Sequence, residues 1–252
     1  MTPTPVATVV ITYFQPRLAL LDRCLSLLRR QTVALEIIVA YDGPGPGDDP
    51  RIDLLLAMAE TGGGRAPNRG LRTGFARATT NYVIHCPPEM LVPVDGVERM
   101  TAGHQPGHRD VPALFALSRE TTEHLDDLPW RETLSCLKDT PDFWTTWGPL
   151  AMNNIDSQWC NWHINFCGAT RDEWLRFGVL PDSDRHDMNE NWLAEMEAKA
   201  GPGAHPILSP VEVYHQWHAP GHWPCPPPEP TPVQPSTVPE SVRVARAKGN
   251  EA

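Results

Sequence analysis

The sequence lacks any long hydrophobic run and any paired cysteine motif. Its longest apolar runs, such as residues 7–11 and 54–59, are too short to cross a bilayer. The amino-terminal stretch MTPTPVATVV has no basic residue and no long apolar core, so we expect no secretory signal. The 6 cysteines are scattered without a Cys-x-x-Cys pair, which argues against a disulfide framework and against a zinc knuckle. We therefore expect a cytoplasmic protein with reduced thiols.

Positive charge is also scarce in this chain. It has 21 Lys and Arg residues against 31 Asp and Glu residues, which gives a formal net charge of −10. A protein that follows nucleic-acid phosphates needs a basic surface, so we expect no nucleic-acid binding. A nucleotide ligand is still compatible with this charge, because it needs only a local positive patch or a metal ion.

What the sequence does contain is enough apolar material for a folded domain. Hydrophobic residues make up 40% of the 252 positions, and a chain of this length can bury a large core. From residue 223 onward the sequence is rich in proline and almost free of apolar residues. We therefore predict one domain over residues 1–222 and a disordered tail over residues 223–252.

Apolar strands and helical patterns alternate along the first 95 residues. Residues 6–12 and 36–40 are β-branched runs typical of strands buried on both faces of a parallel sheet, and the leucines between them recur at helical spacing. Such a strand–helix–strand order is a βαβ unit. We also predict helices over 52–59 and 70–79 and a strand over 81–85. The result is an open α/β sheet, in which ligands bind at the carboxyl ends of the strands.

The second half of the chain has fewer clear patterns and no internal repeat. We predict a strand near residues 113–118, helices over 172–177 and 189–199, and a short late strand over 211–215.

A doubled proline follows the strand predicted over residues 81–85. Proline cannot donate to a sheet ladder, so Pro87 and Pro88 must lie at or beyond the end of that strand. Glu89 comes next and is the only acid in the stretch HCPPEMLVP. These nine residues alone leave two interpretations open, a solvated acid on a surface turn or a functional carboxylate.

Motifs at successive strand ends carry a family resemblance. VVITYFQP, LLRRQT and EIIVAYDGP follow one another in the first 45 residues, and GLRTGFARATTNYVIHCPPEM comes after them. Together they resemble the family 2 glycosyltransferases of the GT-A fold in order and spacing. NFCGATRDEWLRFGVL, DMNENWLAEM and VYHQWH are similar to later motifs of that family. The resemblance covers roughly residues 6–220, and its first 45 residues are the specific part.

The sequence also departs from the family pattern. Gly70-Leu71-Arg72 stands in place of Ala-Arg-Asn, and Pro87-Pro88-Glu89 replaces the Asp-x-Asp metal motif. Tyr41 occupies the place of a family aspartate, so recognition of the base is expected to differ from that of a uridine-specific member.

The resemblance implies a fold and an activity. The fold would be a Rossmann-like open α/β sheet of GT-A type, mostly parallel and flanked by helices. Its nucleotide-binding half would be residues 1–95, and its acceptor and catalytic half residues 96–222. The activity would be metal-dependent, inverting transfer of a sugar from a nucleotide-diphosphate donor to a hydroxyl of a glycan, lipid or protein acceptor.

The resemblance further implies a donor site. Its residues would be Thr12, Tyr13, Tyr41, Asp42, Arg69 and Arg72. Alternatively, Asp42 is only a turn-forming residue before Gly-Pro, and Tyr13 is an ordinary rim aromatic. The two arginines would meet the diphosphate, unless they are simply exposed.

A cation site and a general base are implied in the same way. Glu89 with His218, or less favourably His215, would bind Mn²⁺ or Mg²⁺ together with the diphosphate oxygens. The histidines are alternatively part of a Trp-rich surface loop, and their spacing does not support a zinc hydrolase. Glu190 would be the base, or Asp187 if the loop is displaced by one turn. Both acids are alternatively solvated in the first turn of a helix.

Two other functions remain open. A protein that binds nucleotide sugars without turnover is suggested by Pro87 and Tyr41, which stand where the family has acids. A nucleotidyltransferase is less expected, because no Gly-rich, Lys-bearing loop follows the first strand.

Overall fold

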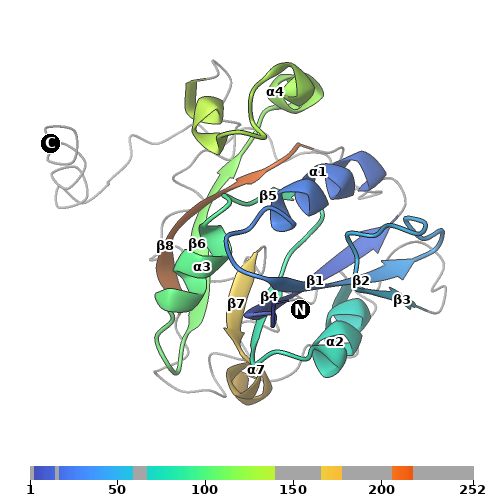
Figure 1. The fold of residues 1–252 in the computed structure, drawn as a ribbon, viewed down its shortest axis with the longest axis vertical. Helices are drawn as coiled ribbons and strands as arrows, with labels where there is room; N and C mark the ends of the chain where they lie inside the picture. Colours follow the sequence, from blue (N-terminus) through green and yellow to red (C-terminus); the bar gives the residue numbers. More distant parts are fainter. Residues whose placement is uncertain (1–2, 15–16, 59–66, 140–165, 178–205, 218–252) are drawn as a thin grey trace, which may run out of the picture. The chain divides into compact units, whose positions relative to one another are not determined.

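The computed structural model describes residues 3–14, 17–58, 67–139, 166–177 and 206–217 (Figure 1). The helix predicted over 189–199 and the tail predicted over 223–252 lie outside these ranges. The described helices are all too short or too polar to span a membrane.

One open mixed sheet of eight strands forms the centre of the described fold, in the order β3-β2-β1-β4-β7-β6-β8-β5. The strands are β1 (Ala7–Phe14), β2 (Leu35–Asp42), β3 (Leu54–Ala57), β4 (Tyr82–His85), β5 (Met90–Leu91), β6 (Arg109–Ala116), β7 (Cys167–Thr170) and β8 (Pro206–His215). The four strands from β3 to β4 are mutually parallel. β7 is antiparallel to both its neighbours, β5 is antiparallel to β8, and β6 is parallel to β8. The predicted α/β class is confirmed.

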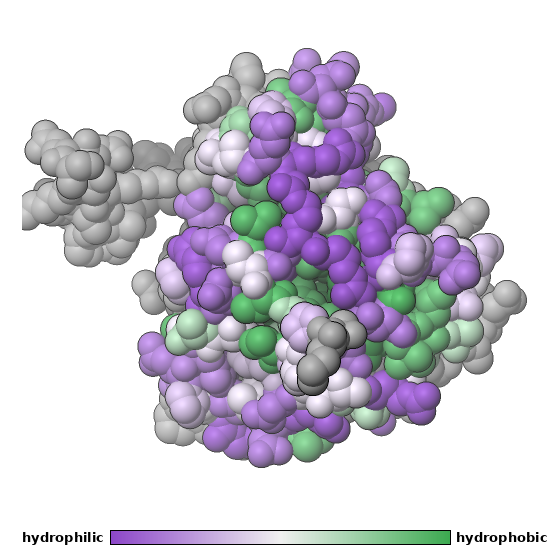
Figure 2. All heavy atoms as spheres, viewed as in Figure 1, coloured by the Kyte–Doolittle hydropathy of each residue, from purple (hydrophilic) through white to green (hydrophobic). Residues whose placement is uncertain are grey.

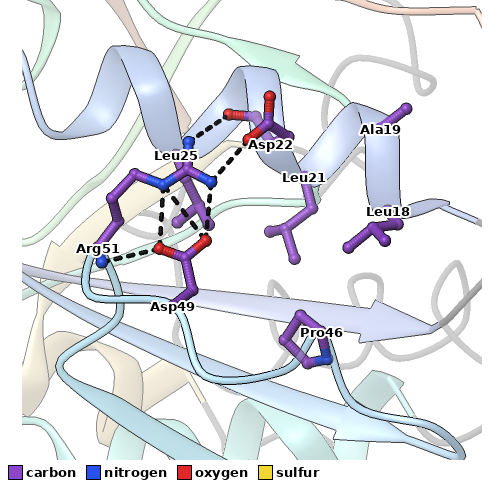
Figure 3. Close-up of a pocket in the computed structure, with 8 residues that line it drawn as sticks. All are labelled: Leu18, Ala19, Leu21, Asp22, Leu25, Pro46, Asp49 and Arg51. Carbon is purple, nitrogen blue, oxygen red and sulfur yellow. Dashed lines mark hydrogen bonds and ion pairs between the residues drawn. The ribbon is translucent and has the colours of Figure 1, made fainter.

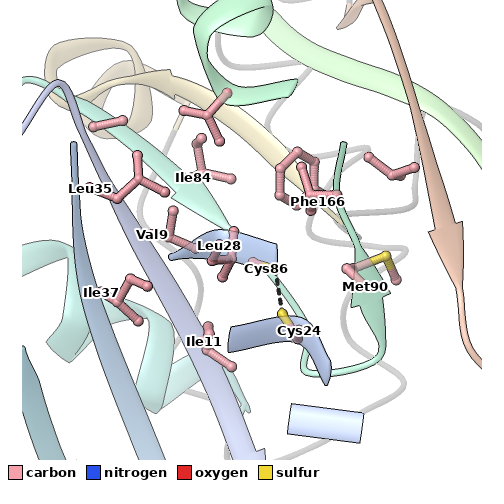
Figure 4. Close-up of a cluster of buried hydrophobic side chains, with 14 of the residues drawn as sticks. Val9, Ile11, Cys24, Leu28, Leu35, Ile37, Ile84, Cys86, Met90 and Phe166 are labelled. Atoms are coloured by element: carbon pink, nitrogen blue, oxygen red, sulfur yellow. Dashed lines mark hydrogen bonds between the residues drawn. The ribbon is translucent and has the colours of Figure 1, made fainter. Parts of the chain in front are cut away.

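Helices cover both faces of the sheet (Figure 1). They are α1 (Leu18–Leu28), α2 (Pro67–Arg77), α3 (Gly96–Ala102), α4 (Arg119–Glu123) and α7 (Arg171–Phe177), with 3₁₀ turns η2 (Leu125–Asp127) and η3 (Leu134–Asp139). The apolar side of α1 packs on the β1 side chains Val9, Ile11 and Tyr13 (Figure 4). The alternate β1 side chain Val10 packs on the opposite face with Leu71 of α2. This alternation is the period of two expected of a strand buried on both faces.

Two glycines let α2 lie directly on β1. A Cβ atom at Gly74 would stand 2.3 Å from Val10 Cγ1, and one at Gly70 would stand 3.2 Å from Thr12 Cγ2. The close approach requires these positions to have no side chain. The amino-terminal half of α2 is thereby fixed above the carboxyl end of β1.

The helix predicted over residues 52–59 is wrong, because this segment contains β3. Two hydrogen bonds join Asp53 to Ile37. The backbone N–H of Asp53 donates to the Ile37 carbonyl, and the side chain of Asp53 accepts from the Ile37 N–H. These bonds align the next four residues with β2 as a parallel neighbour. Leucine and alanine favour helices in isolation, but the open edge of β2 overrides that preference.

Several predicted elements have different ends. β6 begins at Arg109 instead of near Ala113 and contains Pro112, where its pairing with β8 shifts register. A proline removes one ladder donor, which accounts for an irregularity at this point. β8 begins at Pro206, five residues before the predicted late strand.

The surface seen in Figure 2 is mainly hydrophilic over α4, with apolar residues in smaller groups below it. Among the described residues, the large apolar side chains that are exposed are Val6, Leu18, Leu55, Val94 and Leu175. They come from separate parts of the chain.

Between β1 and α1 the core includes the buried thiols of Cys24 and Cys86, whose sulfur atoms lie 3.7 Å apart (Figure 4).

Candidate functional site

The carboxyl ends of β1 and β2 lie side by side in the sheet, and the neighbouring strand β4 points the same way but ends earlier, beside Val10 of β1. Tyr13 of β1 pairs with Tyr41 of β2, and Phe14 pairs with Asp42. On the other side of β1, Val10 pairs with His85 at the end of β4. Because these strands are parallel, the segments that follow them all leave the sheet on the side of the carboxyl ends, which we call the ligand edge. This is the edge at which the sequence predicts a ligand.

Thr12 and Tyr13 point to opposite faces at this edge. Thr12 lies against Gly70 of α2, whereas Tyr13 is buried in the core under α1 with only 3% of its surface exposed. Burial raises the pKa of the Tyr13 phenol. The two side chains therefore do not face one another, and a role of either residue in donor binding stays a prediction. Tyr13 has the environment of a core aromatic.

Tyr41 and Asp42 lie where β2 gives way to a glycine-rich loop. A Cβ atom at Gly45 would be 2.9 Å from Cε2 of Tyr41, so this loop folds against the ring. Gly43, with a φ of +77°, supplies the left-handed backbone that turns the chain after Asp42. The Asp42 side chain is outside the described part. The nucleotide role of both residues stays a prediction.

The two predicted arginines lie on α2, the helix that covers Thr12. Arg72 is half-buried there. Arg69 precedes Gly70 in the same helix, and only its backbone is described. Their contact with a diphosphate stays a prediction.

Glu89 is a buried carboxylate and not a solvated one. Only 4% of its surface is exposed. The turn begins with a bond from Met90 N–H to the Pro87 carbonyl, and β5 then pairs Met90 with His215 at the end of β8. The Glu89 carbonyl also accepts from the backbone and side-chain N–H groups of Gln216. The doubled proline thus lies beyond the end of β4, as predicted. In the turn that it forms, the side chain of Glu89 is buried.

An arginine that sequence reasoning missed holds this carboxylate. Arg17 Nη1 donates to both Glu89 oxygens at 2.9 Å. His215 Nε2 lies 3.5 Å from Glu89 Oε1, so the structure brings together two of the predicted cation ligands. Arg17 comes immediately before α1, and no motif marked it, because a single arginine after a proline has no distinctive spacing. A buried carboxylate needs such a partner.

The described residues do not form a ready divalent-cation site. Mn²⁺ and Mg²⁺ require several oxygen ligands. In the described ranges no group of three or more His, Cys, Asp or Glu side chains is arranged to hold a metal ion, and both Glu89 oxygens accept from Arg17. His218, Glu190 and Asp187 lie outside those ranges. Metal binding by Glu89 and His215 stays a prediction, and with Arg17 in place these residues do not fit the cation.

A second buried polar cluster lies at the opposite end of β4. We call Tyr82, His104, Asp110 and Glu173 the amino-edge cluster. His104 Nδ1 lies 2.6 Å from Asp110 Oδ2, and its Nε2 lies 3.1 Å from Glu173 Oε2. The Tyr82 hydroxyl donates to Asp110, while Glu173 accepts from the N–H groups of Gly107 and Thr170. No pattern in the sequence predicted that these four residues lie together.

The two acids of the amino-edge cluster have opposite pKa shifts. Burial raises the pKa of Asp110, although bonds from Tyr82 and His104 oppose this. Burial also acts to raise the pKa of Glu173, but the bonds from Gly107 and Thr170 together bring it below its usual range. Burial, followed by the charge of Asp110, raises the pKa of Tyr82 far above its usual range.

A shallow depression lies between α1 and the loop after β2 (Figure 3). Arg51 spans it, with ion pairs to Asp22 of α1 at 2.6 Å and to Asp49 at 2.7 Å. The hydrogen bond from Arg51 lowers the pKa of Asp49. The rest of the lining is mainly apolar, and its charges are paired with one another. This contact fastens the loop to α1.

Comparison with known proteins supports the fold. No protein-family model matches the sequence, and no curated protein matches it either. Among solved structures, the chain is similar to TarS of S. aureus, with a TM-score of 0.55 and 11% identity over 84% of this chain. A structure of TarS residues 1–349 gives a TM-score of 0.53 and 10% identity over 83% of this chain. The chain therefore shares its fold with part of TarS.

The match covers only part of TarS. It spans 36% of the longer TarS chain and 60% of the shorter one. At this low identity the likeness shows the fold alone, and family 2 membership remains a resemblance at the level of motifs.

Proposed function

We propose that this protein is a glycosyltransferase that moves a sugar from a nucleoside-diphosphate donor to an acceptor hydroxyl. The observation that carries the proposal is the charged pair Arg17–Glu89 beside His215, at the edge where the parallel strands β1, β2 and β4 end. The likeness of the fold to TarS supports it independently. Open α/β sheets bind their ligands at this edge.

The proposed reaction needs charge stabilisation and positioning. The leaving diphosphate gains negative charge as the glycosidic bond breaks, and cationic groups beside it lower the barrier. Holding donor and acceptor in line supplies much of the remaining acceleration. Inversion requires a base at the acceptor hydroxyl, for which Glu190 and then Asp187 are predicted. The base, the inverting course and the glycan, lipid or protein acceptor are parts of the proposal that await experiment, and the predicted metal dependence is weighed separately in the next subsection.

The direct test is a calorimetric screen of nucleoside-diphosphate sugars that vary in base and sugar, run once with Mn²⁺ and once with EDTA. We expect at least one donor to bind. Asp42→Ala should weaken that binding at least tenfold, whereas Asp48→Ala, which removes an exposed acid of the same loop, should leave it unchanged. Absence of binding by every donor in both conditions would contradict the proposal.

A donor-binding protein without turnover is the second candidate. Its support is that Pro87 stands where the family has the first acid of its metal motif, and that the remaining acid, Glu89, is already engaged by Arg17. Transfer or donor hydrolysis that disappears in Glu190→Gln, with donor affinity retained, would exclude it. Tight donor binding with no product from any acceptor would favour it.

A further inference from the structure

We infer that the guanidinium of Arg17 takes the place of a divalent cation at Glu89, and that it faces the donor diphosphate without metal. The inference rests on the proposed function for the identity of the donor. Its claim about Glu89 is separate, because it concerns which cation occupies this carboxylate in the protein without ligand.

The first argument is the geometry of the pair. Both Glu89 oxygens accept from one nitrogen of Arg17, Nη1, at 2.9 Å. The side chain of Glu89 is 5% exposed and that of Arg17 is 17% exposed, so solvent screens the pair only weakly. A divalent cation bound to the same two oxygens would lie beside the guanidinium charge. It could bind only after Arg17 had moved away.

The second argument is the number of ligands. A hard divalent cation takes six or more oxygen ligands, and this turn offers one carboxylate because Pro87 and Pro88 have no ligating side chain. A guanidinium needs only one carboxylate to be neutralised. It also presents five N–H donors in a planar fork that matches both carboxylate and phosphate oxygens. The composition of the turn therefore favours arginine over a metal ion.

The third argument is that rigid elements hold both partners. Arg17 leads directly into α1, whose residues Leu21, Cys24 and Leu25 are buried in the core. The Glu89 backbone is fixed by two bonds from Gln216 to its carbonyl oxygen. The pair is thus assembled before any ligand arrives, as expected of a preorganised charge that stabilises a departing anion.

The first experiment needs no nucleotide. Mn²⁺ is added to the wild-type protein and to Arg17→Met, and binding is followed by the loss of the electron paramagnetic resonance signal of free Mn²⁺. The wild type should bind no Mn²⁺ at millimolar concentrations. Arg17→Met leaves Glu89 and His215 as two protein ligands, so it should bind one ion weakly, with water completing the coordination, and melt at a higher temperature when Mn²⁺ is present. Arg30→Met is the matched control, since it removes the same charge from an exposed side chain just after α1, and it should behave as the wild type.

The outcomes of this titration are decisive. Stoichiometric Mn²⁺ binding by the wild type would overturn the inference. So would a folded Arg17→Met protein that neither binds Mn²⁺ nor gains thermal stability from it. If Arg17→Met fails to fold, Arg17→Lys keeps the charge and should still exclude Mn²⁺, and the wild-type measurement remains valid by itself.

The second experiment uses the donor found in the calorimetric screen. Wild-type affinity should be the same within twofold in Mn²⁺ and in EDTA, and Arg17→Met in EDTA should bind at least tenfold more weakly. Arg17→Lys should lie between them, because a point charge lacks the fork. Wild-type binding that requires Mn²⁺ would overturn the inference and leave the proposed function standing. Failure of every donor to bind would instead remove the proposed function, and the Mn²⁺ titration would still decide the occupant of Glu89.

Discussion

The two ends of β4 carry buried carboxylates that are held in different ways. At the carboxyl end, Glu89 is met by the side chains of Arg17 and His215, both from distant parts of the chain. At the amino end, Glu173 accepts from the backbone N–H groups of Gly107 and Thr170, and His104 joins it to Asp110. A side chain can rotate away from its partner, but a backbone amide cannot be withdrawn without local unfolding.

This difference separates a site that can exchange partners from one that holds the fold together. The amino-edge cluster connects β4, the start of β6 and the β7–α7 junction, so its bonds serve the architecture. The Glu89 pair lies at the edge where we propose that the donor binds, and there its guanidinium would turn toward the incoming anion. Burial of an acid is therefore no guide to its role. Glu173 is held by backbone donors and Asp110 by the side chains of Tyr82 and His104 within the same cluster, whereas Glu89 is held by the partly exposed Arg17.

The largest effect should come from breaking the amino-edge cluster. Asp110→Ala leaves the Tyr82 hydroxyl and His104 without their acceptor in the interior, and we expect it to lower the free energy of unfolding by about 3–5 kcal/mol. Urea unfolding of this variant beside Asp172→Ala, which removes an exposed acid on α7, measures the difference. A loss no larger than that of Asp172→Ala would mean that the cluster is not structural.

A smaller effect is expected at the other end of β4. Glu89→Gln keeps the size of the side chain and one of the two oxygens that accept from Arg17, and the arginine is exposed enough to turn toward water. We expect a cost of about 1–2 kcal/mol in the same urea assay. If Glu89→Gln proved as destabilising as Asp110→Ala, the contrast between an exchangeable and a fixed carboxylate would fail.

The smallest effect is a pair of opposite changes in the pH dependence of stability. Because the folded pKa of Glu173 lies below its ordinary value of 4.5, this acid stabilises the fold above that pH and the contribution is lost on acidification. The folded pKa of Asp110 lies above its ordinary value of 3.8, so its contribution becomes more favourable as pH falls. One group can change the slope by at most about 1.4 kcal/mol per pH unit.

Glu173→Gln should therefore make the acid loss of stability shallower, and Asp110→Asn should make it steeper. Urea midpoints of both variants and the wild type between neutral pH and the acid limb test these signs. Changes of the same sign in the two variants would show that the two carboxylates do not titrate as their surroundings indicate.

The sequence was sufficient to predict those elements whose residue pattern depends on near neighbours in the chain. The β1–α1–β2 unit, the strand before Pro87 and the helix over α7 follow from local periodicity and from proline chemistry, and the structure confirms them. The segment Leu54–Ala57 was predicted wrongly because its leucines fit either a helix or a strand, and only the adjacent edge of β2 decides between them.

The candidate site was predictable only in part, for a related reason. Glu89 and His215 were chosen by resemblance, and the structure does bring them together. Arg17 was missed because its partner is 72 residues away, and nothing in the local sequence indicates that pairing. His104 and Asp110 were missed because β6 begins with the charged residues Arg109 and Asp110, which no strand pattern includes.

The contacts of Gln216 bear on the order in which parts of the fold can form during synthesis. Its side chain is fully buried and binds the carbonyls of Leu20 and Glu89, 196 and 127 residues earlier in the chain. Contacts this distant in sequence form late, since a large loop must close before they give any stability. During synthesis the turn that carries Glu89 therefore emerges long before the strand that locks it. The ligand edge can be completed only when β8 has left the ribosome and added itself to the sheet.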